Sequence, residues 1–274
     1  ILLYHAFGWK PPLFCHLPMV MGQDGKKLSK RHGATSVNEF RKAGYLADAL
    51  INYVALLGAS YKEGQDIYTL DELAAHFSLQ KLNKAPAVFD YKKLEWFNAQ
   101  YIKAKPPEEL AALAVPFAVE AGLFGTGGAA AQPDAGQYEL FVQAMTLVAE
   151  RAVLLRDIPA KLGYLFAEPP VPLPEEFIPK KSTVAAARNL LGIGRALVPQ
   201  MAGLADAAAE ELAKGKAAEE NVKIGDLLMP LRVAITGSRI SPPLFASIRL
   251  LKAEKCLARV DRALAVLSET AAGV

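Results

Sequence analysis

Cysteine is scarce in this sequence, which excludes one class of small secreted protein. Its 274 residues contain two cysteines, Cys15 and Cys256, far apart along the chain. A disulfide framework needs several cysteine pairs in a short chain, so a reducing setting is expected. Cys15 is followed by His16, but the other histidines are distant and zinc-ligand spacing is missing. We therefore predict no metal site and a cytoplasmic location.

Long hydrophobic runs are also absent. No apolar stretch approaches the roughly 20 residues that span a membrane. The apolar opening ILLYHAFGW has no basic segment before it and is a poor signal peptide. The net charge is only +3, which allows a nucleic-acid partner without requiring one. With 52% hydrophobic and 22% charged residues, the composition predicts a folded, soluble protein with no membrane partner.

The chain lacks an initiator methionine and begins with Ile1. We interpret this as the sign of a piece taken from a longer parent. The length is still enough for two or more domains.

Strand signals are few and lie early in the chain. The run LFCHLPMVM, residues 13–21, is typical of a short buried strand, and we expect strand content before about residue 70. A Gly/Ala-rich stretch at 124–137 predicts a linker, and the proline-rich stretch at 168–179 predicts a boundary between helical parts.

Helix signals dominate after residue 35. Capping boxes at 36–39 and 69–72 each predict the start of a helix. Asp90 is a plausible cap for a helix whose Trp96 and Phe97 we expect in the core. Pro106–Glu109, with proline and acidic residues, predicts another helix start, and Ser241 followed by Pro242 predicts a capped one. A long helix is predicted from about Tyr138 to Asp157.

A short basic loop lies between the predicted strand and the first of these helices. The stretch GQDGKKLSKRHGATS, residues 22–36, has basic side chains bracketed by glycines. A charge run of this kind is usually a solvated turn, and the Walker pattern is missing. The alternative is a phosphate loop, because Lys27 and Lys30 can follow the charge that builds up as pyrophosphate leaves a triphosphate. Ser36 is expected to be a cap, and His32 a loop residue.

Four blocks of the sequence resemble one family. Lys27-Leu-Ser-Lys30-Arg31 resembles the KMSKS signature of class I aminoacyl-tRNA synthetases. The longer stretch DGKKLSKRHGATSV resembles bacterial-type glutamyl-tRNA synthetases. GYLADALINYVALLG, FDYKKLEWFNAQYI and PLRVAITGSRISPPLF resemble later segments of that family, in family order. The family's preceding HIGH-type motif has no counterpart, so the chain resembles the C-terminal half, beginning just before the KMSKS-type loop.

The resemblance implies a mainly α fold. A small α/β or α+β remnant would carry the KMSKS-type loop and the stem-contact fold, followed by two all-α anticodon-binding subdomains. The implied divisions are the end of the catalytic domain (residues 1–35) and the stem-contact domain (36–105). Helical anticodon-binding subdomains 1 (106–172) and 2 (173–274) follow.

The resemblance also implies an activity for the parent protein. It would attach L-glutamate to tRNA(Glu) with ATP and Mg²⁺, acting as a monomer. The implied ATP-binding loop consists of Lys27, Leu28, Ser29, Lys30 and Arg31. The two lysines would stabilise the transition state of glutamate activation. We expect this chain alone to be inactive in that step, because the HIGH-type half of the site is missing.

Two sets of tRNA contacts follow from the resemblance. Anticodon bases are single-stranded and can be read on their edges, a task that suits the planar fork of arginine. The implied anticodon-binding residues are Arg151, Arg232, Ser241, Pro242 and Leu244. Basic residues implied to contact tRNA phosphates are Arg41, Lys92, Lys93 and Lys214. Arg151 further implies an enzyme that rejects tRNA for glutamine by reading the third anticodon base.

Other interpretations remain open at this point. The chain could be a stand-alone tRNA-binding module without a catalytic parent, or a glutaminyl-tRNA synthetase relative. The latter family reads the anticodon with β-barrels, whereas the C-terminal half here has a helical pattern. One departure from the glutamyl family is Lys252, which stands where a glycine is expected in an LLGKE-like turn.

Overall fold

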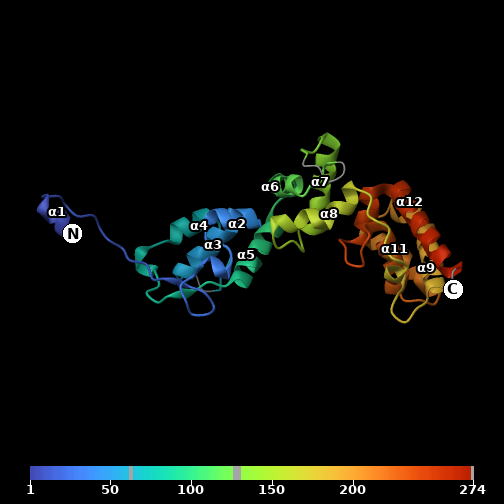
Figure 1. Cartoon of the computed structure of the whole chain (residues 1–274), viewed down its shortest axis with the longest axis horizontal. Helices are drawn as coiled ribbons and strands as arrows, with labels where there is room; N and C mark the ends of the chain where they lie inside the picture. The colour runs from blue at the N-terminus through green and yellow to red at the C-terminus, as the bar shows by residue number, and fades with distance from the viewer. Residues whose placement is uncertain (62–63, 126–130, 273–274) are drawn as a thin grey trace. The chain divides into compact units, whose positions relative to one another are not determined.

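The fold is built mainly from helices, as the computed structural model shows (Figure 1). It describes residues 1–61, 64–125 and 131–272, and within these ranges the only sheet is one pair of two-residue strands. The predicted mainly α fold class is confirmed. The chain divides into two compact units, Ile1–Tyr101 and Ile102–Val274. The four predicted domains are finer than these units and stay a prediction.

Unit 1, residues Ile1–Tyr101, holds the only sheet of the described chain and most of helix α5. Its elements in chain order are α1 (Leu2–Ala6), β1 (Val20–Met21), the 3-10 helix η1 (Lys30–His32), α2 (Val37–Ala43), α3 (Ala47–Gly58), α4 (Leu70–His76), η2 (Leu79–Lys81), β2 (Ala87–Val88) and α5 (Tyr91–Ala104). Strands β1 and β2 are parallel, with Val20 opposite Ala87. The buried core consists of Phe40, Tyr53, Phe89, Leu94 and Phe97.

Unit 2, residues Ile102–Val274, is helical throughout its described part. Its elements are α6 (Pro107–Glu120), α7 (Ala135–Val148), η4 (Leu155–Asp157), α8 (Ile158–Phe166), η5 (Pro174–Phe177), α9 (Val184–Met201), α10 (Asp206–Glu219), α11 (Ile224–Thr236) and α12 (Leu244–Ala272). Helix α9 packs against both α11 and α12, and α6 packs against α7 (Figure 1). Fully buried apolar side chains such as Phe141, Leu191 and Val260 form its interior.

The capping predictions at Ser36, Thr69 and Asp90 are confirmed. Ser36 accepts from the Glu39 backbone N–H at 3.3 Å, and Glu39 accepts in return from Ser36 N–H at 2.9 Å. Thr69 and Glu72 form the same reciprocal pair at the start of α4. Asp90 accepts from two backbone N–H groups in the first turn of α5. These local hydrogen bonds satisfy helix N–H groups that have no partner inside the helix.

The predicted buried strand at 13–21 is wrong except at its end. Only Val20 and Met21 form a strand, and Leu13, Phe14 and Leu17 are exposed. The second strand lies after residue 70, at Ala87–Val88, so the predicted position of strand content is also wrong in part. A strand needs a pairing partner, and β1 finds that partner 67 residues later in the chain (Val20 to Ala87).

Two helix predictions in the C-terminal part are also corrected. The predicted helix at 138–157 ends earlier, because α7 stops at Val148 and a turn separates it from η4 and α8. Ser241 is not a helix cap, because α12 begins at Leu244 and the Ser241 hydroxyl is used elsewhere. Trp96 is 47% exposed and not in the core, whereas Phe97 is fully buried as predicted.

Residues 126–130 of the predicted Gly/Ala linker lie outside the described residues. In the described part of the chain, no helix combines the length and the apolar character needed to cross a membrane.

Candidate functional site

The basic loop is anchored to unit 1 at both ends. Gly22 N–H donates to Lys26 O at 2.8 Å, and Leu28 N–H donates to Val20 O at 3.0 Å, which brings the strand β1 and the end of the loop together. Leu28 also packs against the aromatic core of unit 1. Gly25 has a φ of +71°, a backbone conformation that glycine adopts without strain. The loop is thus a tight turn held by backbone contacts on a packed base.

His32 closes this turn from inside. The backbone N–H of Ser29 donates to Nδ1 of His32 at 3.0 Å, and Nε2 of His32 donates to Asp24 at 3.1 Å. A Cβ on Gly22 would lie 2.8 Å from the His32 ring, so glycine is needed there for this close approach. His32 lies at the end of η1 rather than in an irregular loop, and its ring holds the turn together.

The loop leaves two lysines available. Hydrogen bonding by Lys26 N–H, with His32 and Arg31 close by, keeps the pKa of Asp24 below its usual range. The Arg31 guanidinium lies 3.3 Å from this carboxylate and is thereby engaged. Lys27 and Lys30 are exposed, and within the described ranges their ammonium groups form no ion pair. Two unengaged ammonium groups close together along the chain form a local positive charge that attracts anions.

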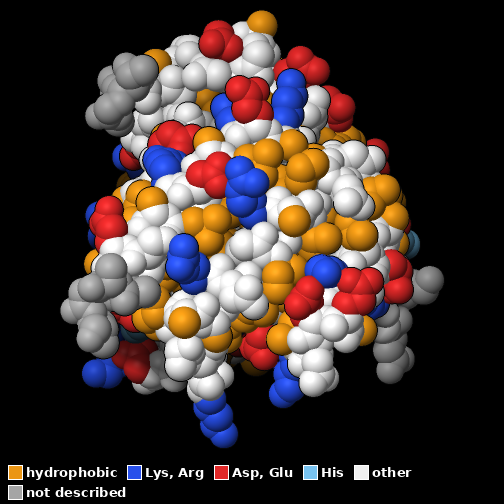
Figure 2. Space-filling model, turned by 90° about the vertical axis from the view of Figure 1, so that its right-hand side faces the viewer, with side chains coloured by type: hydrophobic (Ala, Val, Ile, Leu, Met, Phe, Trp, Pro, Cys, Tyr) orange, Lys and Arg blue, Asp and Glu red, His pale blue; other side chains and the backbone are white. Residues whose placement is uncertain are grey.

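The four residues predicted to contact tRNA phosphates fall into two situations. Arg41 on α2 and Lys92 and Lys93 on α5 are exposed and form no ion pair with the part of unit 1 that the structure describes. Lys214 on α10 instead lies 3.0 Å from Glu210 and 2.8 Å from Glu211. Figure 2 shows a face on which Lys and Arg side chains lie next to Asp and Glu. Lys214 would have to leave its carboxylates to bind a phosphate.

Three of the five predicted anticodon residues line one open cavity inside unit 2. The cavity has a volume of about 680 Å³ and is lined by Arg151, Ser241 and Pro242, with apolar side chains such as Leu147 and Val148. Arg151 follows the end of α7, whereas Ser241 and Pro242 precede α12. The cavity therefore brings together residues that lie 90 positions apart in the sequence (151 to 241). Leu244 is buried at the start of α12 and does not line the cavity.

Arg232 on α11 joins this group through hydrogen bonds. Its Nη1 donates to the Ser241 hydroxyl at 2.6 Å and to the Pro242 carbonyl at 3.0 Å. Burial, followed by the nearby positive charge of Arg151, lowers the pKa of Arg232. The Nε and Nη2 groups of this half-buried side chain have no hydrogen-bond partner among the described residues, and since no buried side-chain N or O atom there lacks a partner, neither group is fully buried. They remain available to a ligand.

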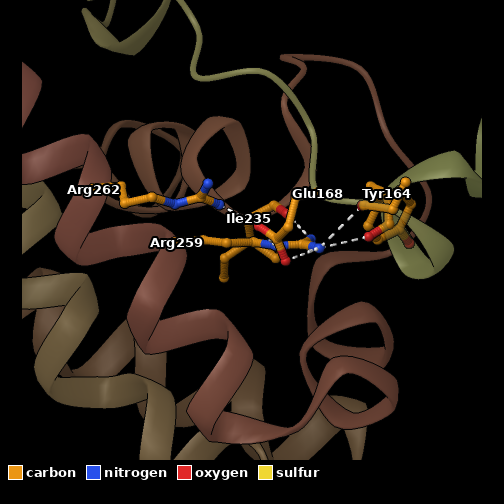
Figure 3. Close-up of polar contacts among 6 residues, drawn as sticks. Tyr164, Glu168, Ile235, Arg259 and Arg262 are labelled. Carbon is orange, nitrogen blue, oxygen red and sulfur yellow. Dashed lines mark hydrogen bonds and ion pairs between the residues drawn. The ribbon is translucent and has the colours of Figure 1, made fainter. Parts of the chain in front are cut away.

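A buried arginine holds the helices around the cavity in place. Arg259 of α12 has a side chain that is 2% exposed. It donates to Ile235 O at the end of α11, at 2.7 Å, and to Tyr164 O of α8, at 2.9 Å (Figure 3). It also pairs with Glu168 at 3.1 Å, a carboxylate that it shares with Arg262. Helix ends leave carbonyls without partners, and one guanidinium supplies donors to two of them.

Tyr164 ties α8 to α12 a second time. Its hydroxyl lies 2.6 Å from the Ser247 hydroxyl, which itself donates to Pro243 O at 2.7 Å, so Tyr164 is the donor of the pair. Gly237 ends α11 with a φ of +74°, and a Cβ there would lie 2.8 Å from Pro169. These contacts set the distance between the walls of the cavity.

The sequence reasoning missed several residues of this site, namely Arg156, Lys161, Tyr164, Glu168 and Arg259. The first four line the cavity. A weak signal existed for Arg259 alone, because it lies within the apolar stripe of the last helix. The others follow no periodic pattern, since their positions depend on how α8 packs.

A second cavity lies in unit 1 and differs in chemistry. It has a volume of about 310 Å³ and is lined mainly by apolar side chains, including Val20, Val54 and Phe77, with no charged residue in its lining. It therefore lacks the cations that phosphate binding needs. In the described ranges, no cluster of three or more His, Cys, Asp or Glu side chains could hold a metal ion.

The cavity and the basic loop each lie in a region of the chain that matches a known family. Residues 109–264 match the family described as anticodon binding domain. The chain belongs to the anticodon binding domain family. The matched region contains the 680 Å³ cavity and all five predicted anticodon residues. Residues 1–96 match the family described as tRNA synthetases class I (E and Q), catalytic domain, a region that contains the basic loop.

Individual proteins similar to this chain include glutamate–tRNA ligases. The chain is 49% identical to the glutamate–tRNA ligase from Treponema denticola, over 97% of this chain and 55% of the relative. It is 41% identical to the one from Borrelia recurrentis, over 96% of this chain and 51% of the relative. The resemblance to glutamyl-tRNA synthetases is thereby confirmed. The chain spans about half the length of these relatives.

A solved structure gives the same family. The crystal structure of a glutamate tRNA ligase from Elizabethkingia meningosepticum in complex with its amino acid superposes with a TM-score of 0.70 and 26% identity. The match covers 97% of this chain and 54% of the other.

Proposed function

We propose that this chain is the tRNA-binding, anticodon-recognising part of a glutamate–tRNA ligase. The observation that carries the proposal is that Arg151, Ser241 and Pro242 line one cavity inside the matched anticodon binding domain, with Arg232 hydrogen-bonded to Ser241 and Pro242. The 49% identity to a glutamate–tRNA ligase over nearly the whole chain supports the choice of tRNA(Glu) as partner.

The cavity has the two kinds of surface that an unstacked base needs. Apolar side chains such as Leu147 and Pro242 offer contact to a base face, and arginine forks offer hydrogen bonds to a base edge. Arg151, which is exposed and lines the cavity, is one such fork, and the unpartnered Nε and Nη2 of Arg232, behind Ser241 and Pro242, are a second. In this arrangement Ser241 and the Pro242 carbonyl orient Arg232, so that its remaining donors point in one direction.

In this proposal the basic loop of unit 1 binds ATP. Lys27 and Lys30 bind the triphosphate and stabilise the charge that develops as pyrophosphate leaves. Leu28 anchors the loop in the core, Ser29 holds it through His32, and Arg31 pairs with Asp24. Mg²⁺ accompanies the nucleotide, and we assign no residue of this chain to it.

The chain by itself is not proposed to activate glutamate. None of its four histidines lies in a HIGH-type motif, so L-glutamate and the other side of ATP would need further residues. Pyrophosphate exchange catalysed by the purified chain would contradict this. We also propose that the protein works in the cytoplasm, with its tRNA, and as a monomer, which size-exclusion chromatography can check.

Binding of tRNA tests the proposal directly. We expect the chain to bind tRNA(Glu) more tightly than an unrelated tRNA, and the affinity for both to fall as salt is raised. Filter binding or fluorescence anisotropy at several salt concentrations measures both effects. Equal affinity for the two tRNAs would rule out the proposed anticodon recognition.

Replacement of Arg151 by glutamine tests the reading of a base. We expect Arg151→Gln to lower the preference for tRNA(Glu) over tRNA for glutamine about 10-fold, because one bidentate contact contributes roughly 1–3 kcal/mol of discrimination. Competition binding of the two tRNAs to the chain measures this preference, and charging assays measure it in the full-length ligase. Arg188→Gln is the control, since Arg188 is exposed on α9 and does not line the cavity. An unchanged preference in Arg151→Gln would contradict the assignment.

A further inference from the structure

Two more cations line the cavity opposite α11, and neither belongs to the predicted anticodon set. Arg156 is exposed on η4, and Lys161 is half-buried on α8. With Arg151 they belong to the lining that the turn after α7, η4 and α8 contribute, which we call one wall of the cavity.

Among the described residues, neither cation is paired, unlike several other cations of unit 2. Lys103, Arg195 and Lys214 all form ion pairs within unit 2. Across the residues that the structure describes, Arg156 and Lys161 form neither an ion pair nor a side-chain hydrogen bond. Unpaired cations at one concave site indicate a binding role more strongly than a solvated surface does.

The carboxylates of the cavity do not neutralise the two cations. Glu168 lines the cavity, but Arg259 and Arg262 already engage its carboxylate (Figure 3). Asp157 lies next to Arg156 and also lines the cavity, yet it forms no ion pair with Arg156 or Lys161 among the described contacts. The charge on this wall therefore remains available to an anion.

We propose that Arg156 and Lys161 bind the phosphodiester groups next to the bases that enter the cavity. This inference rests on the proposed function and divides the site into two parts. Arg151 and Arg232 recognise base edges, whereas Arg156 and Lys161 hold the backbone and carry no sequence information. Phosphate contacts of this kind fix the register of the RNA and release counterions on binding.

The salt dependence of RNA binding is the test. The probe is a hairpin RNA with the anticodon stem and loop of tRNA(Glu), bound to the 274-residue chain. Each phosphate contact in a single strand contributes about 0.7 to the slope of log K against log[salt]. We expect Arg156→Gln and Lys161→Gln each to reduce the slope by about that amount and to weaken binding several-fold. The preference among third-base variants of the hairpin is expected to stay unchanged.

Two further variants make the test one of charge. Asp157→Asn removes a negative charge from the same wall and is expected to strengthen binding, most clearly at low salt. Lys255→Gln, at an exposed cation on α12 that does not line the cavity, is expected to leave the slope unchanged. A slope equal to wild type in both Arg156→Gln and Lys161→Gln, or an altered base preference, would overturn the inference.

Failure of the proposed function gives a different result. If the wild-type chain shows no preference for the tRNA(Glu) hairpin over one with another loop, anticodon recognition is wrong. The slopes of Arg156→Gln and Lys161→Gln still decide the phosphate contacts in that case, because they are measured without reference to base identity.

Discussion

At Lys252 the backbone takes a conformation that side chains rarely adopt. Its φ of 65° and ψ of 158° interrupt α12, and this region is essentially restricted to glycine. The resemblance predicts a glycine here, and the backbone of this chain has a conformation that suits glycine although the residue is lysine. A non-glycine residue in this region costs about 1–3 kcal/mol.

Replacing Lys252 by glycine should therefore stabilise the protein. We expect a gain of about 1 kcal/mol for Lys252→Gly, because relief of the strain exceeds the entropy that an added glycine costs on folding. Urea unfolding followed by circular dichroism measures it. Lys252→Ala is the control: it removes the charge but keeps the Cβ, so its stability should match wild type. A gain of equal size in both variants would show that the backbone is not strained.

Among the elements, helix α2 depends on a charged capping residue. Hydrogen bonds from the N–H groups of Thr35 and Ser36 lower the pKa of Glu39 from 4.5 to about 2. A group whose pKa is lower in the folded state contributes stability above its unfolded pKa. This contribution is lost as the pH falls through the folded value.

The stability of wild type should consequently fall between about pH 4.5 and pH 2 more steeply than that of Glu39→Gln. Above this window, the ionised cap should make wild type the more stable of the two. Urea unfolding at a series of pH values provides the comparison. The other carboxylates contribute equally to the pH dependence of both proteins, so the difference between the two curves reports on Glu39. Parallel curves over the whole range would argue against an ionised cap.

Helices α8, α11 and α12 are joined through Arg259. Removing this side chain leaves carbonyls at two helix ends and the Glu168 carboxylate without their buried donor. A buried acceptor that loses its donor costs about 1–3 kcal/mol. The same carboxylate is bound from outside by Arg262, which is 44% exposed.

Arg259→Ala should lower the free energy of unfolding by about 2–6 kcal/mol, because two buried carbonyls lose their donor, and Arg262→Ala by about 1 kcal/mol or less. Chemical unfolding of both variants under one set of conditions measures the difference. Both arginines lie on α12 and bind the Glu168 carboxylate, so the two variants differ mainly in how buried the removed side chain is. Equal losses would mean that the carbonyl contacts of Arg259 contribute little.

At the scale of the whole molecule, each unit has its own core. Phe97 is fully buried in unit 1, and Phe141 is fully buried in unit 2, where it lies 5.3 Å from Phe124 between ring centroids. Chains with several domains often depart from a single two-state unfolding transition. Separate cores predict separate transitions.

Urea unfolding should therefore show two transitions that respond to different mutations. We expect Phe97→Ala to lower one by about 3–5 kcal/mol and Phe141→Ala to lower the other by a similar amount. Phe141→Leu, which leaves a smaller cavity, should shift the same transition as Phe141→Ala by less. One shared transition that both alanine variants lower would show that the units unfold together.

Local features of this protein could be predicted from the sequence. The capping boxes at Ser36 and Thr69 begin helices because their hydrogen bonds join residues three apart. The tight basic loop follows from its glycines, and the exposed lysines follow from its charge. Such features depend on neighbours in the chain, so the sequence alone was enough to determine them.

Features that depend on distant partners required the tertiary structure. The run at 13–21 is apolar, yet it is largely exposed, because only its last two residues find a partner strand. Ser241 looked like a cap, but its hydroxyl binds Arg232 instead. The cavity joins Arg151 to Ser241, and Arg259 joins helices whose contact carbonyls lie up to 95 residues away. Only packing decides such contacts, because the order of residues does not state which helix faces lie together.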